Sequence, residues 1–498
     1  MKTRSLISLF CLGLFAATAH ARAYDDVVLL PVADDPTVSY RIVFFAGSVY
    51  DPPGKEGLAA LTARMIAEAS TKQHRYEEIL DLLFPMAGGY EASCSVETVT
   101  ISGRIHKDSV AAFQPLLLQA IVEPAFRSED LERIRSDMIS YLENTLRYAG
   151  DEDLGKAVLY ETVFAGTPYA HIPAGRVTSL KSITMGDVRA FYQTYYSYYN
   201  CAIGLGGGYS AEMLNSLKAG LAKLPHRALP LAVLLPTNGL HGLHVTIVEK
   251  DAPATAISIG ARLDVFRGWP DWYPLALANS WFGEHRNSAS HLYQVIREVR
   301  GLNYGDYSYI EHFANGGALE FPAPGDPRRQ QIFEMWIRPV PNAWGHFALR
   351  AALRELKRLV DDGLNEEQVK EKRAALGKYV FHFAPTTMDR LGYALDDTFY
   401  RIEGSHLNLY RNAMQGMIRD QVNAAVRKHL QYKDLQIVIV AKDAQALRKA
   451  LISDAPSPIV YPTPRPAGVL KEDQQIINYP LHIRPENVRI ISGKTLFE

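Results

Sequence analysis

The chain has 498 residues, with 53 basic and 54 acidic side chains, 47% hydrophobic residues and 21% charged residues. This balance of charge argues against a protein that binds nucleic acid or a membrane surface through the charge of the whole chain. The length exceeds what one hydrophobic core usually organises, so we expect two or more globular domains. Neutral peptides or proteins are the partners that fit this composition best.

Residues 1–23 have the pattern of a secretory signal peptide. Two basic residues precede an apolar run over residues 6–17, which is too short to span a bilayer. Overlapping cleavage triplets end at Ala21 and at Ala23, and the sequence leaves both sites open. No later segment stays apolar for the roughly 20 residues of a membrane helix. We therefore expect an exported, periplasmic protein without stable membrane insertion.

Two cysteines, Cys94 and Cys201, follow the signal peptide. In an oxidising compartment they can form a disulfide, but nothing in the sequence determines the distance between them. Two buried thiols are an equally good interpretation, so both alternatives stay open.

Residues 57–68 follow a predicted strand over residues 40–47 and have the apolar spacing of an amphipathic helix. The positions of its apolar face are Leu58, Leu61, Met65 and Ile66. Positions i, i+3 and i+4 of a helix share one face, and Ala60, Ala63 and Arg64 have this spacing. Two methyl groups and a guanidinium therefore lie together there.

The chain contains an internal repeat, because residues 38–233 and 244–454 share one order of strands and helices. Near the ends of the two stretches, residues 187–203 align without a gap on residues 421–437. A repeat of this length implies two homologous domains and is far too long for a solenoid.

The repeat predicts an N-terminal domain over residues 24–228, a linker over 229–243 and a C-terminal domain over 244–454. Prolines and glycines punctuate the linker. A tail over residues 455–498 follows, with five prolines between residues 456 and 466. Such a proline-rich segment is extended, so we expect it to run along the surface.

The second repeat contains a predicted helix that stops at Gly301, followed by a predicted strand over residues 304–310. Its apolar stripe is formed by Leu292, Val295, Ile296 and Val299. Arg297 lies off this stripe, and Tyr304 follows Arg297 by seven residues.

The helix over residues 57–68 and the block over residues 292–305 resemble the insulinase/pitrilysin family of zinc peptidases, including its bacterial members similar to the mitochondrial processing peptidase. In that family the first helix carries His-x-x-Glu-His, whose imidazoles bind zinc while the glutamate activates water. Ala60, Ala63 and Arg64 occupy these positions here, and none of them can ligate zinc. The resemblance thus implies a domain without the metal site.

In the second block, the family holds the substrate backbone with an arginine and with a tyrosine seven residues later. The resemblance assigns this clamp to Arg297 and Tyr304. The alternative is that Arg297 and Arg300 only favour the helix C-terminus electrostatically while Tyr304 packs in the sheet. For Arg300 we expect only the helix-terminus role.

Three further segments have weaker signals. Residues 88–93 resemble the strand on which the family pairs its substrate. Glu143 lies in the region of the family's third zinc ligand, but without the histidines we interpret it as a solvated helix charge. The glycine run over residues 204–208 is interpreted as the end of a strand. The close histidine pairs are His241 with His244 and His285 with His291, and we expect all four on the surface.

The resemblance implies an α+β fold of two homologous domains, each a largely antiparallel sheet packed with helices, around a peptide-sized cavity. It also implies a non-catalytic, substrate-binding subunit, which has no cofactor and no activity alone. Its partner is a homologous catalytic subunit that carries His-x-x-Glu-His and the zinc. Two alternatives stay open: an independently active zinc metallopeptidase with unrecognised ligands, and a peptide-binding or chaperone-like protein without a catalytic partner.

Overall fold

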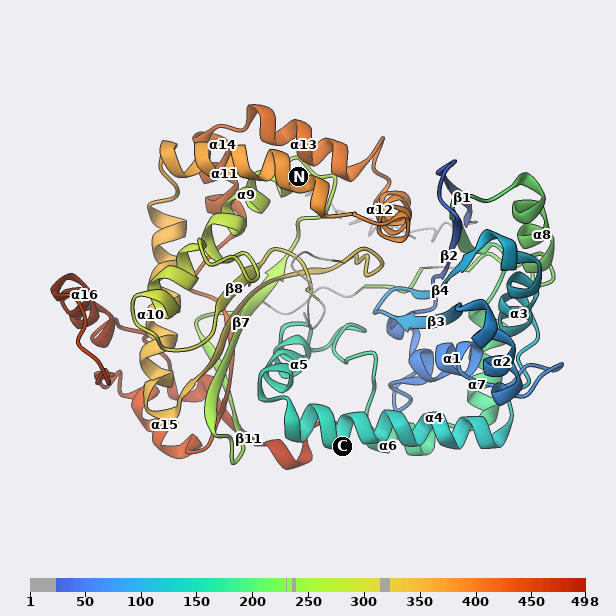
Figure 1. Cartoon of the computed structure of the whole chain (residues 1–498). Coiled ribbons are helices and arrows are strands. Elements are labelled where there is room, and N and C mark those ends of the chain that lie inside the picture. Colours follow the sequence, from blue (N-terminus) through green and yellow to red (C-terminus); the bar gives the residue numbers. More distant parts are fainter. Residues whose placement is uncertain (1–23, 230, 235–238, 314–322) are drawn as a thin grey trace, which may run out of the picture.

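The computed structural model describes residues 24–229, 231–234, 239–313 and 323–498, so the expected signal peptide lies outside the described part. Two helix-covered sheets dominate the molecule (Figure 1). We call residues 24–229 the first half and residues 239–498 the second half. This arrangement confirms the predicted α+β fold with two sheets.

The first sheet has five strands in the order β1-β5-β2-β4-β3, and all neighbours are antiparallel except β1 and β5. Its strands are β1 (Tyr24–Pro31), β2 (Thr37–Phe44), β3 (Gly89–Cys94), β4 (Val99–His106) and β5 (Asn200–Gly207). The α-helices of the first half are α1 (Leu58–Ala67), α2 (Tyr76–Leu83), α3 (Val110–Val122), α4 (Ser128–Ser140), α5 (Asp151–Val163), α6 (Val177–Ser182), α7 (Met185–Tyr195) and α8 (Ala211–Leu221). A π-helical segment, η4 (Tyr141–Ala149), joins α4 to the region of α5.

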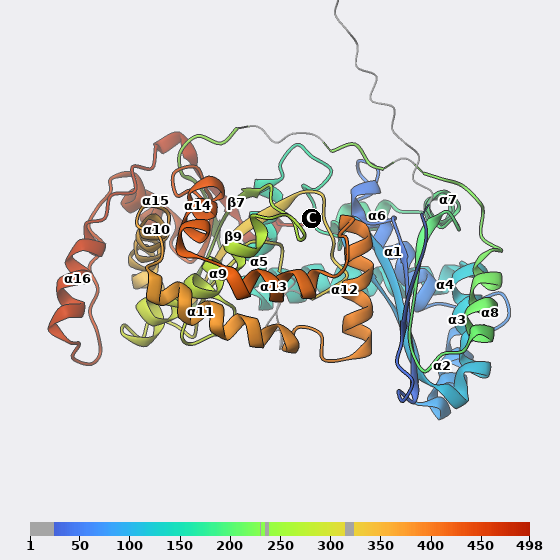
Figure 2. The same ribbon diagram turned by 90° about the horizontal axis from the view of Figure 1, so that it is seen from above.

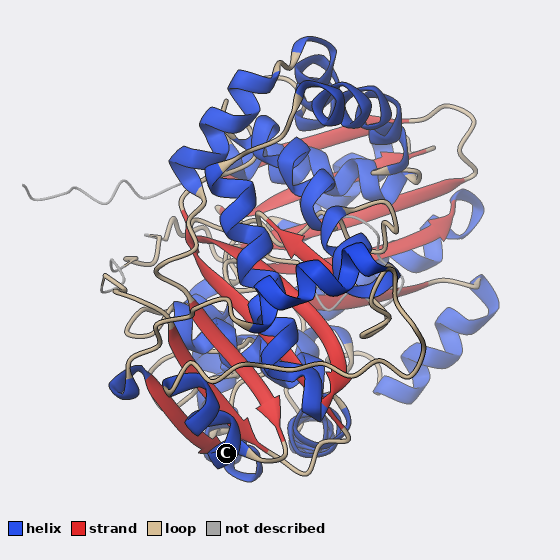
Figure 3. Cartoon of the chain, turned by 90° about the vertical axis from the view of Figure 1, so that its left-hand side faces the viewer, coloured by secondary structure: helices blue, strands red, loops and turns tan. Residues whose placement is uncertain are grey.

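The second sheet has six strands in the order β11-β6-β10-β7-β9-β8. Its strands are β6 (His244–Glu249), β7 (Ala254–Leu263), β8 (Asp306–Tyr309), β9 (Gln331–Pro341), β10 (Gln436–Ala441) and β11 (Val488–Ser492). The α-helices of the second half are α9 (Trp272–Gly283), α10 (Gly345–Asp361), α11 (Glu366–Tyr379), α12 (Thr387–Tyr400), α13 (His406–Gly416), α14 (Arg419–His429), α15 (Ala444–Ile452) and α16 (Ala467–Ile477). Helices lie in front of this sheet when it is viewed from its outer side (Figure 3).

One helix of each half packs on the sheet of the other half. Helix α12 packs on β1, β2 and β5, whereas α5 packs on β7, β9 and β10 (Figure 2). The glycine run ends β5 as predicted. Because these glycines have no side chains, α12 can pack close to the strand. A Cβ atom at Gly204 would lie 2.8 Å from Leu395 Cδ1, and one at Gly206 would lie 2.9 Å from Thr387 Cγ2. A larger residue at Gly204 or Gly206 would therefore push α12 away from the first sheet.

The C-terminal tail does not only run along the surface, because it also adds a strand to the second sheet and packs in the core of the first half. Its proline-rich part has no helix or strand, as predicted, but α16 and β11 follow it. Strand β11 adds a parallel sixth strand beside β6. The tail then returns to the first half, where Phe497 is 1% exposed and belongs to the core. None of the described helices is both long and apolar enough to cross a membrane.

Candidate functional site

A cavity of about 430 Å³ lies between the two halves. Residues 93–95 at the end of β3, together with η4 and α5, form its wall in the first half. Residues 323–328 and β9 form its wall in the second half. Because β3 is an edge strand of its sheet, one side of its backbone has no strand partner among the described strands. The cavity thus lies at the end of an edge strand, and apolar surface predominates over polar surface in its lining.

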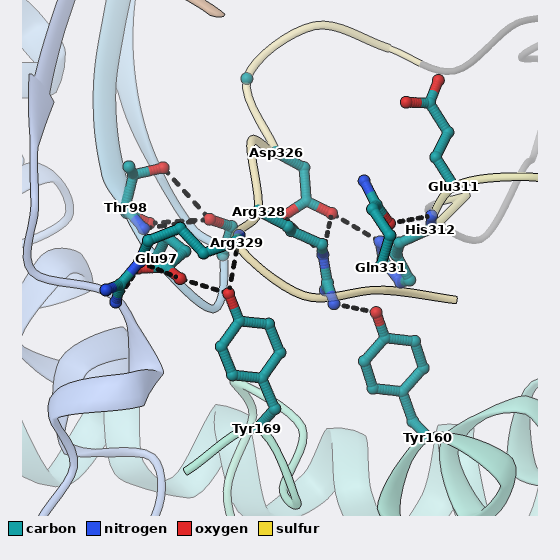
Figure 4. Close-up of polar contacts among 12 residues, drawn as sticks. Glu97, Thr98, Tyr160, Tyr169, Glu311, His312, Asp326, Arg328, Arg329 and Gln331 are labelled. Atoms are coloured by element: carbon teal, nitrogen blue, oxygen red, sulfur yellow. Dashed lines mark hydrogen bonds and ion pairs between the residues drawn. The ribbon is translucent and has the colours of Figure 1, made fainter. Parts of the chain in front are cut away.

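A buried ion pair lies near this cavity, since Arg329 follows the lining residue Arg328 and Glu97 follows the lining residues 93–95. Arg329 donates to both carboxylate oxygens of Glu97 at 2.9 Å, and Glu97 is 1% exposed. The hydroxyl of Tyr169 also donates to Glu97, and burial raises the pKa of Tyr169 well above its usual value, which keeps this donor protonated. Figure 4 shows Tyr169 pointing from the first half toward Arg329. These contacts join the halves through charge-assisted hydrogen bonds.

A second cluster of polar side chains in the same region lines the cavity. Arg328 donates to the hydroxyl of Tyr160, and Asp326 lies 2.5 Å from the ring nitrogen of His312 (Figure 4). Burial would lower the pKa of His312, but the carboxylate of Asp326 outweighs it and raises this pKa above its ordinary value. Glu334 is 1% exposed, and burial raises the pKa of its carboxyl. The wall therefore offers protonatable donors and acceptors to a bound polar group.

Helix α1 presents the three positions that the resemblance assigns to the zinc motif, Ala60, Ala63 and Arg64. Ala63 is 1% exposed and packs in the core. Arg64 Nη2 lies 2.5 Å from Glu68 Oε2 and 3.4 Å from Asp137 Oδ2 of α4. A guanidinium paired with two carboxylates thus occupies this face, and it has no lone pair with which to coordinate a metal ion. With Ala60 as the third residue, the donor set does not fit zinc.

The acidic side chain of α4 that pairs with Arg64 is Asp137, whereas the resemblance places the third ligand of the family near Glu143. Both residues lie in one helical region, and its periodicity alone does not say which turn faces α1. Within the described residues, no three His, Cys, Asp or Glu side chains are grouped in a way that could hold a metal ion.

Arg297 and Tyr304 flank the end of η5 (Tyr293–Glu298), a π-helical segment before β8. Arg297 has a side chain that is 35% exposed, and its Nη1 lies 3.3 Å from Glu298 Oε2. Tyr304 is 79% exposed and precedes the strand, which starts at Asp306 and is shorter than predicted. Tyr304 therefore does not pack in the sheet. Neither residue is among those that line the cavity between the halves.

The expectation that Arg300 has only a helix-terminus role is wrong, because its side chain binds two carboxylates of the tail. Arg300 is completely buried. Its Nε donates to Asp473 and its Nη2 donates to Glu472 of α16, both at 2.8 Å. The acidic partners lie in the tail, more than a hundred residues away, so no local pattern indicated them.

The histidine pair His285 and His291 is also not a surface pair. His285 Nδ1 lies 2.5 Å from the hydroxyl of Tyr309, and burial lowers the pKa of this histidine to about 4. His291 Nε2 lies 2.6 Å from Oε2 of Glu355, which has no exposed surface. By contrast, His241 is exposed as expected.

The two cysteines are thiols, and their distance excludes a disulfide. Cys94 lies in β3 and Cys201 in β5, and β4 and β2 run between these strands. Three strand spacings of about 4.8 Å separate them by roughly 14 Å. A disulfide needs Cα atoms within about 7 Å. Of the two alternatives, two thiols are therefore correct, with Cys201 buried and Cys94 only partly buried.

Two protein-family models match consecutive parts of the chain. The model of the insulinase family, peptidase family M16, matches residues 27–171. The model of the peptidase M16 inactive domain matches residues 182–376.

Individual relatives agree with these models. The chain is 26% identical over 265 residues to an uncharacterized zinc protease of Mycobacterium tuberculosis, a match that covers 52% of this chain and 53%, about half, of that protein. It is 22% identical over 432 residues to the non-peptidase homolog YmxG of Helicobacter pylori, with coverage of 84% of this chain and 91% of the relative.

A solved structure shows the same fold. The peptidase M16 inactive domain from Pseudomonas fluorescens superposes with a TM-score of 0.73 at 20% identity, covering 88% of this chain and 97% of that chain. The family models, the relatives and this fold agree with one another, and the chain belongs to the insulinase family, peptidase family M16.

Proposed function

We propose that this chain is the non-catalytic, substrate-binding subunit of an exported zinc peptidase. In this function it supplies Arg297 and Tyr304 to a homologous partner that carries His-x-x-Glu-His. The observation that carries the proposal is the site on α1, where Arg64 pairs with Glu68 and Asp137 at the positions that bind zinc in active relatives. The chain therefore depends on a second chain for the metal.

The surface position of the clamp supports a role between chains. Arg297 and Tyr304 are solvent-accessible on the second half, whereas α1 belongs to the first half. Because these two residues do not line the cavity of their own chain, a substrate that they hold is open to the zinc domain of a partner. The relative named as a non-peptidase homolog, which matches over 91% of its length, supports the same assignment.

The clamp residues have the chemistry to act on a peptide carbonyl group. A phenol and a guanidinium donate hydrogen bonds, and such donors stabilise the negative charge that develops on the carbonyl oxygen during hydrolysis. The zinc of the partner supplies the activated water. The cavity between the halves and the free edge of β3 extend the surface on which a peptide can bind.

Metal analysis and activity of the purified chain test the proposal. We expect no stoichiometric zinc and no hydrolysis of casein or a quenched peptide by this chain alone. Addition of a His-x-x-Glu-His homologue from the same cell envelope should restore hydrolysis and form a stable complex. Stoichiometric zinc together with hydrolysis by the isolated chain would favour an independently active peptidase instead.

Co-purification separates the remaining alternative. A chaperone-like peptide-binding protein should retain unfolded peptides but should not associate with a zinc-bearing homologue. The presence of such a homologue in the complex isolated from the native envelope therefore supports the proposal, and its absence under the same conditions favours the chaperone-like protein.

A further inference from the structure

The C-terminal tail holds the segment that carries Arg297 and Tyr304. Arg300 lies between these two residues in the chain and is completely buried. Its side chain makes three contacts. Nη1 donates to the carbonyl oxygen of Val295 at 2.6 Å, and Nε and Nη2 donate to Asp473 and Glu472 of α16 at 2.8 Å each. A fully buried guanidinium needs such partners, and the tail supplies both carboxylates.

A third tail residue, Arg465, contacts the backbone of the same turn with its side chain. Arg465 Nη2 donates to the carbonyl oxygen of Arg300 at 2.8 Å. The next residue, Gly301, has a φ of 68°, and a Cβ atom there would lie 2.8 Å from Arg465 Nη2. This glycine therefore allows both the left-handed turn that ends the helix and the close approach of the tail.

The tail carboxylates are themselves held in place. The hydroxyl of Tyr461 donates to Asp473 at 2.8 Å, and Arg354 of α10 donates to Glu472 at 2.9 Å. Arg350 of α10 is completely buried and binds the tail at Ser457 and at the carbonyl oxygen of Ile477. The tail is thus fixed to the rigid helix α10 before and after it contacts Arg300.

In the described part of the chain, the clamp side chains themselves have weaker contacts, and the guanidinium of Arg297 lies 5.6 Å from the ring centroid of Tyr293. Tyr304 is 79% exposed, and the ion pair of Arg297 is with its neighbour Glu298 at the surface. An exposed pair of this kind contributes little to a fixed geometry. The turn between the two clamp residues is held by Arg300 and the tail on one side and by Asn303 on the other, where the Asn303 amide donates to Asp306 and to the carbonyl oxygen of Arg338.

We infer that Glu472 and Asp473 are positioning residues for Arg297 and Tyr304, and that the proline-rich tail serves to deliver them to Arg300. This inference rests on the proposed function of the clamp. Its physical basis is that a transition-state donor must be held in place, because a displacement of about 1 Å can reduce turnover by as much as roughly 100-fold. The tail acts through Arg300 and does not contact the substrate.

The test uses the full chain with its catalytic partner and the variants Asp473→Asn and Glu472→Gln. Glu486→Gln is the matched control. Glu486 is an exposed tail carboxylate, and its Oε1 lies 3.7 Å from Nε of the exposed Arg484. We expect Asp473→Asn to lower kcat by roughly 10-fold or more, with less change in KM and with the complex intact. Glu472→Gln should have a smaller effect of the same kind, because Asp473 still holds Arg300.

Amide hydrogen exchange provides a readout that does not depend on the partner. In Asp473→Asn, residues 297–305 should exchange faster, whereas β11 and α10 should exchange as in the unaltered chain. Unchanged exchange of residues 297–305 in both variants, with unchanged turnover, would overturn the inference. If exchange rises but Arg297→Ala and Tyr304→Phe leave turnover normal, the tail contact stands and the proposed function of the clamp fails.

If Asp473→Asn does not fold, Glu472→Gln tests whether the tail positions residues 297–305. Glu472 has a side chain that is 31% exposed, so its neutralisation leaves less buried charge unpaired. Faster exchange confined to residues 297–305 in this variant supports positioning, and no difference from Glu486→Gln contradicts it.

Discussion

Arg329 of the second half binds Glu97 of the first half through two contacts of 2.9 Å, so a bidentate ion pair joins the halves beside the cavity. Glu97 is 1% exposed and also accepts a hydrogen bond from Tyr169. The residues come from the loop after β3 and from the segment before β9. The relative position of the two halves therefore depends on a buried charge pair as well as on the exchanged helices.

Neutralising this pair on one side should destabilise the protein. Glu97→Gln leaves the guanidinium of Arg329 without its counter-charge, and removal of one partner of a buried pair typically costs about 3–5 kcal/mol. Because Arg329 is 23% exposed, we expect a loss near the low end of this range in the free energy of unfolding. Denaturant unfolding measures it. The control Glu129→Gln changes an exposed carboxylate, and an equally small loss in both variants would contradict the prediction.

Tyr304→Phe should reduce turnover by the reconstituted pair of subunits and leave folding unchanged. The variant loses one hydrogen-bond donor to the developing oxyanion, and such a loss typically reduces turnover by about 10²–10³-fold. The exposed ring has little packing to lose. Steady-state hydrolysis measures the effect, and Tyr148→Phe, which changes another exposed tyrosine, is the control.

Arg297→Ala should weaken peptide binding as well as turnover. A charge-assisted contact that is present in the bound substrate is lost with the guanidinium, so KM should rise while kcat falls. Arg419→Ala is a matched control, since Arg419 is also an exposed arginine paired with its sequence neighbour, Asp420. Arg300 cannot serve as the control, because its own substitution would remove one partner from each of two tail carboxylates. Near-normal turnover for both clamp variants, with an intact complex, would leave only a structural role for this chain.

Restoring the zinc motif with Ala60→His, Ala63→Glu and Arg64→His should not produce a good enzyme. Ala63 is 1% exposed, so a glutamate there is forced into the core, and the loss of Arg64 leaves Glu68 and Asp137 without their shared partner. Missing ligand-orienting partners alone cost roughly 10–100-fold in affinity or activity. Thermal melting, zinc content and hydrolysis by the triple variant test this. Strong proteolysis would show that the surrounding site is intact.

The carboxyl of Asp397 should make stability depend on pH. Burial, opposed by hydrogen bonds from the amide of His406, raises the pKa of Asp397 to about 7 from an ordinary value of 3.8. The folded chain therefore holds a proton that the unfolded chain releases. Stability contributed by this group is present below pH 4 and is lost as pH rises from about 4 to about 7.

Asp397→Asn cannot ionise and should lack this loss. A shift of about three pKa units corresponds to roughly 4 kcal/mol, so the variant should exceed the unaltered chain in unfolding free energy by up to about that amount at pH 8. Near pH 4 the two should be similar. Denaturant unfolding at several pH values measures the difference, and a difference that does not vary with pH would contradict the assigned pKa.

Local patterns predicted the elements that local physics determines. The helix over residues 57–68 appears as α1, since its apolar spacing matches the helical period, and the stop at Gly301 appears because a glycine tolerates the left-handed turn. The strand expected over residues 304–310 is shorter, because Tyr304 points to solvent and the sheet begins at Asp306. The expected surface position of His285 and His291 is wrong. Each histidine bonds to a residue of another element, Tyr309 or Glu355, which the local sequence does not reveal.

The sequence by itself determined that helix α1 has no zinc ligands at the positions of the motif. Two alanines and an arginine cannot hold zinc in any fold, because the ligand atoms are missing. The tertiary structure alone decided what the charges do: Arg64 pairs with Asp137, Arg329 with Glu97, and Arg300 with the tail. A charge has no periodicity that reveals its partner, and a buried guanidinium binds whichever carboxylate the folded chain brings within reach.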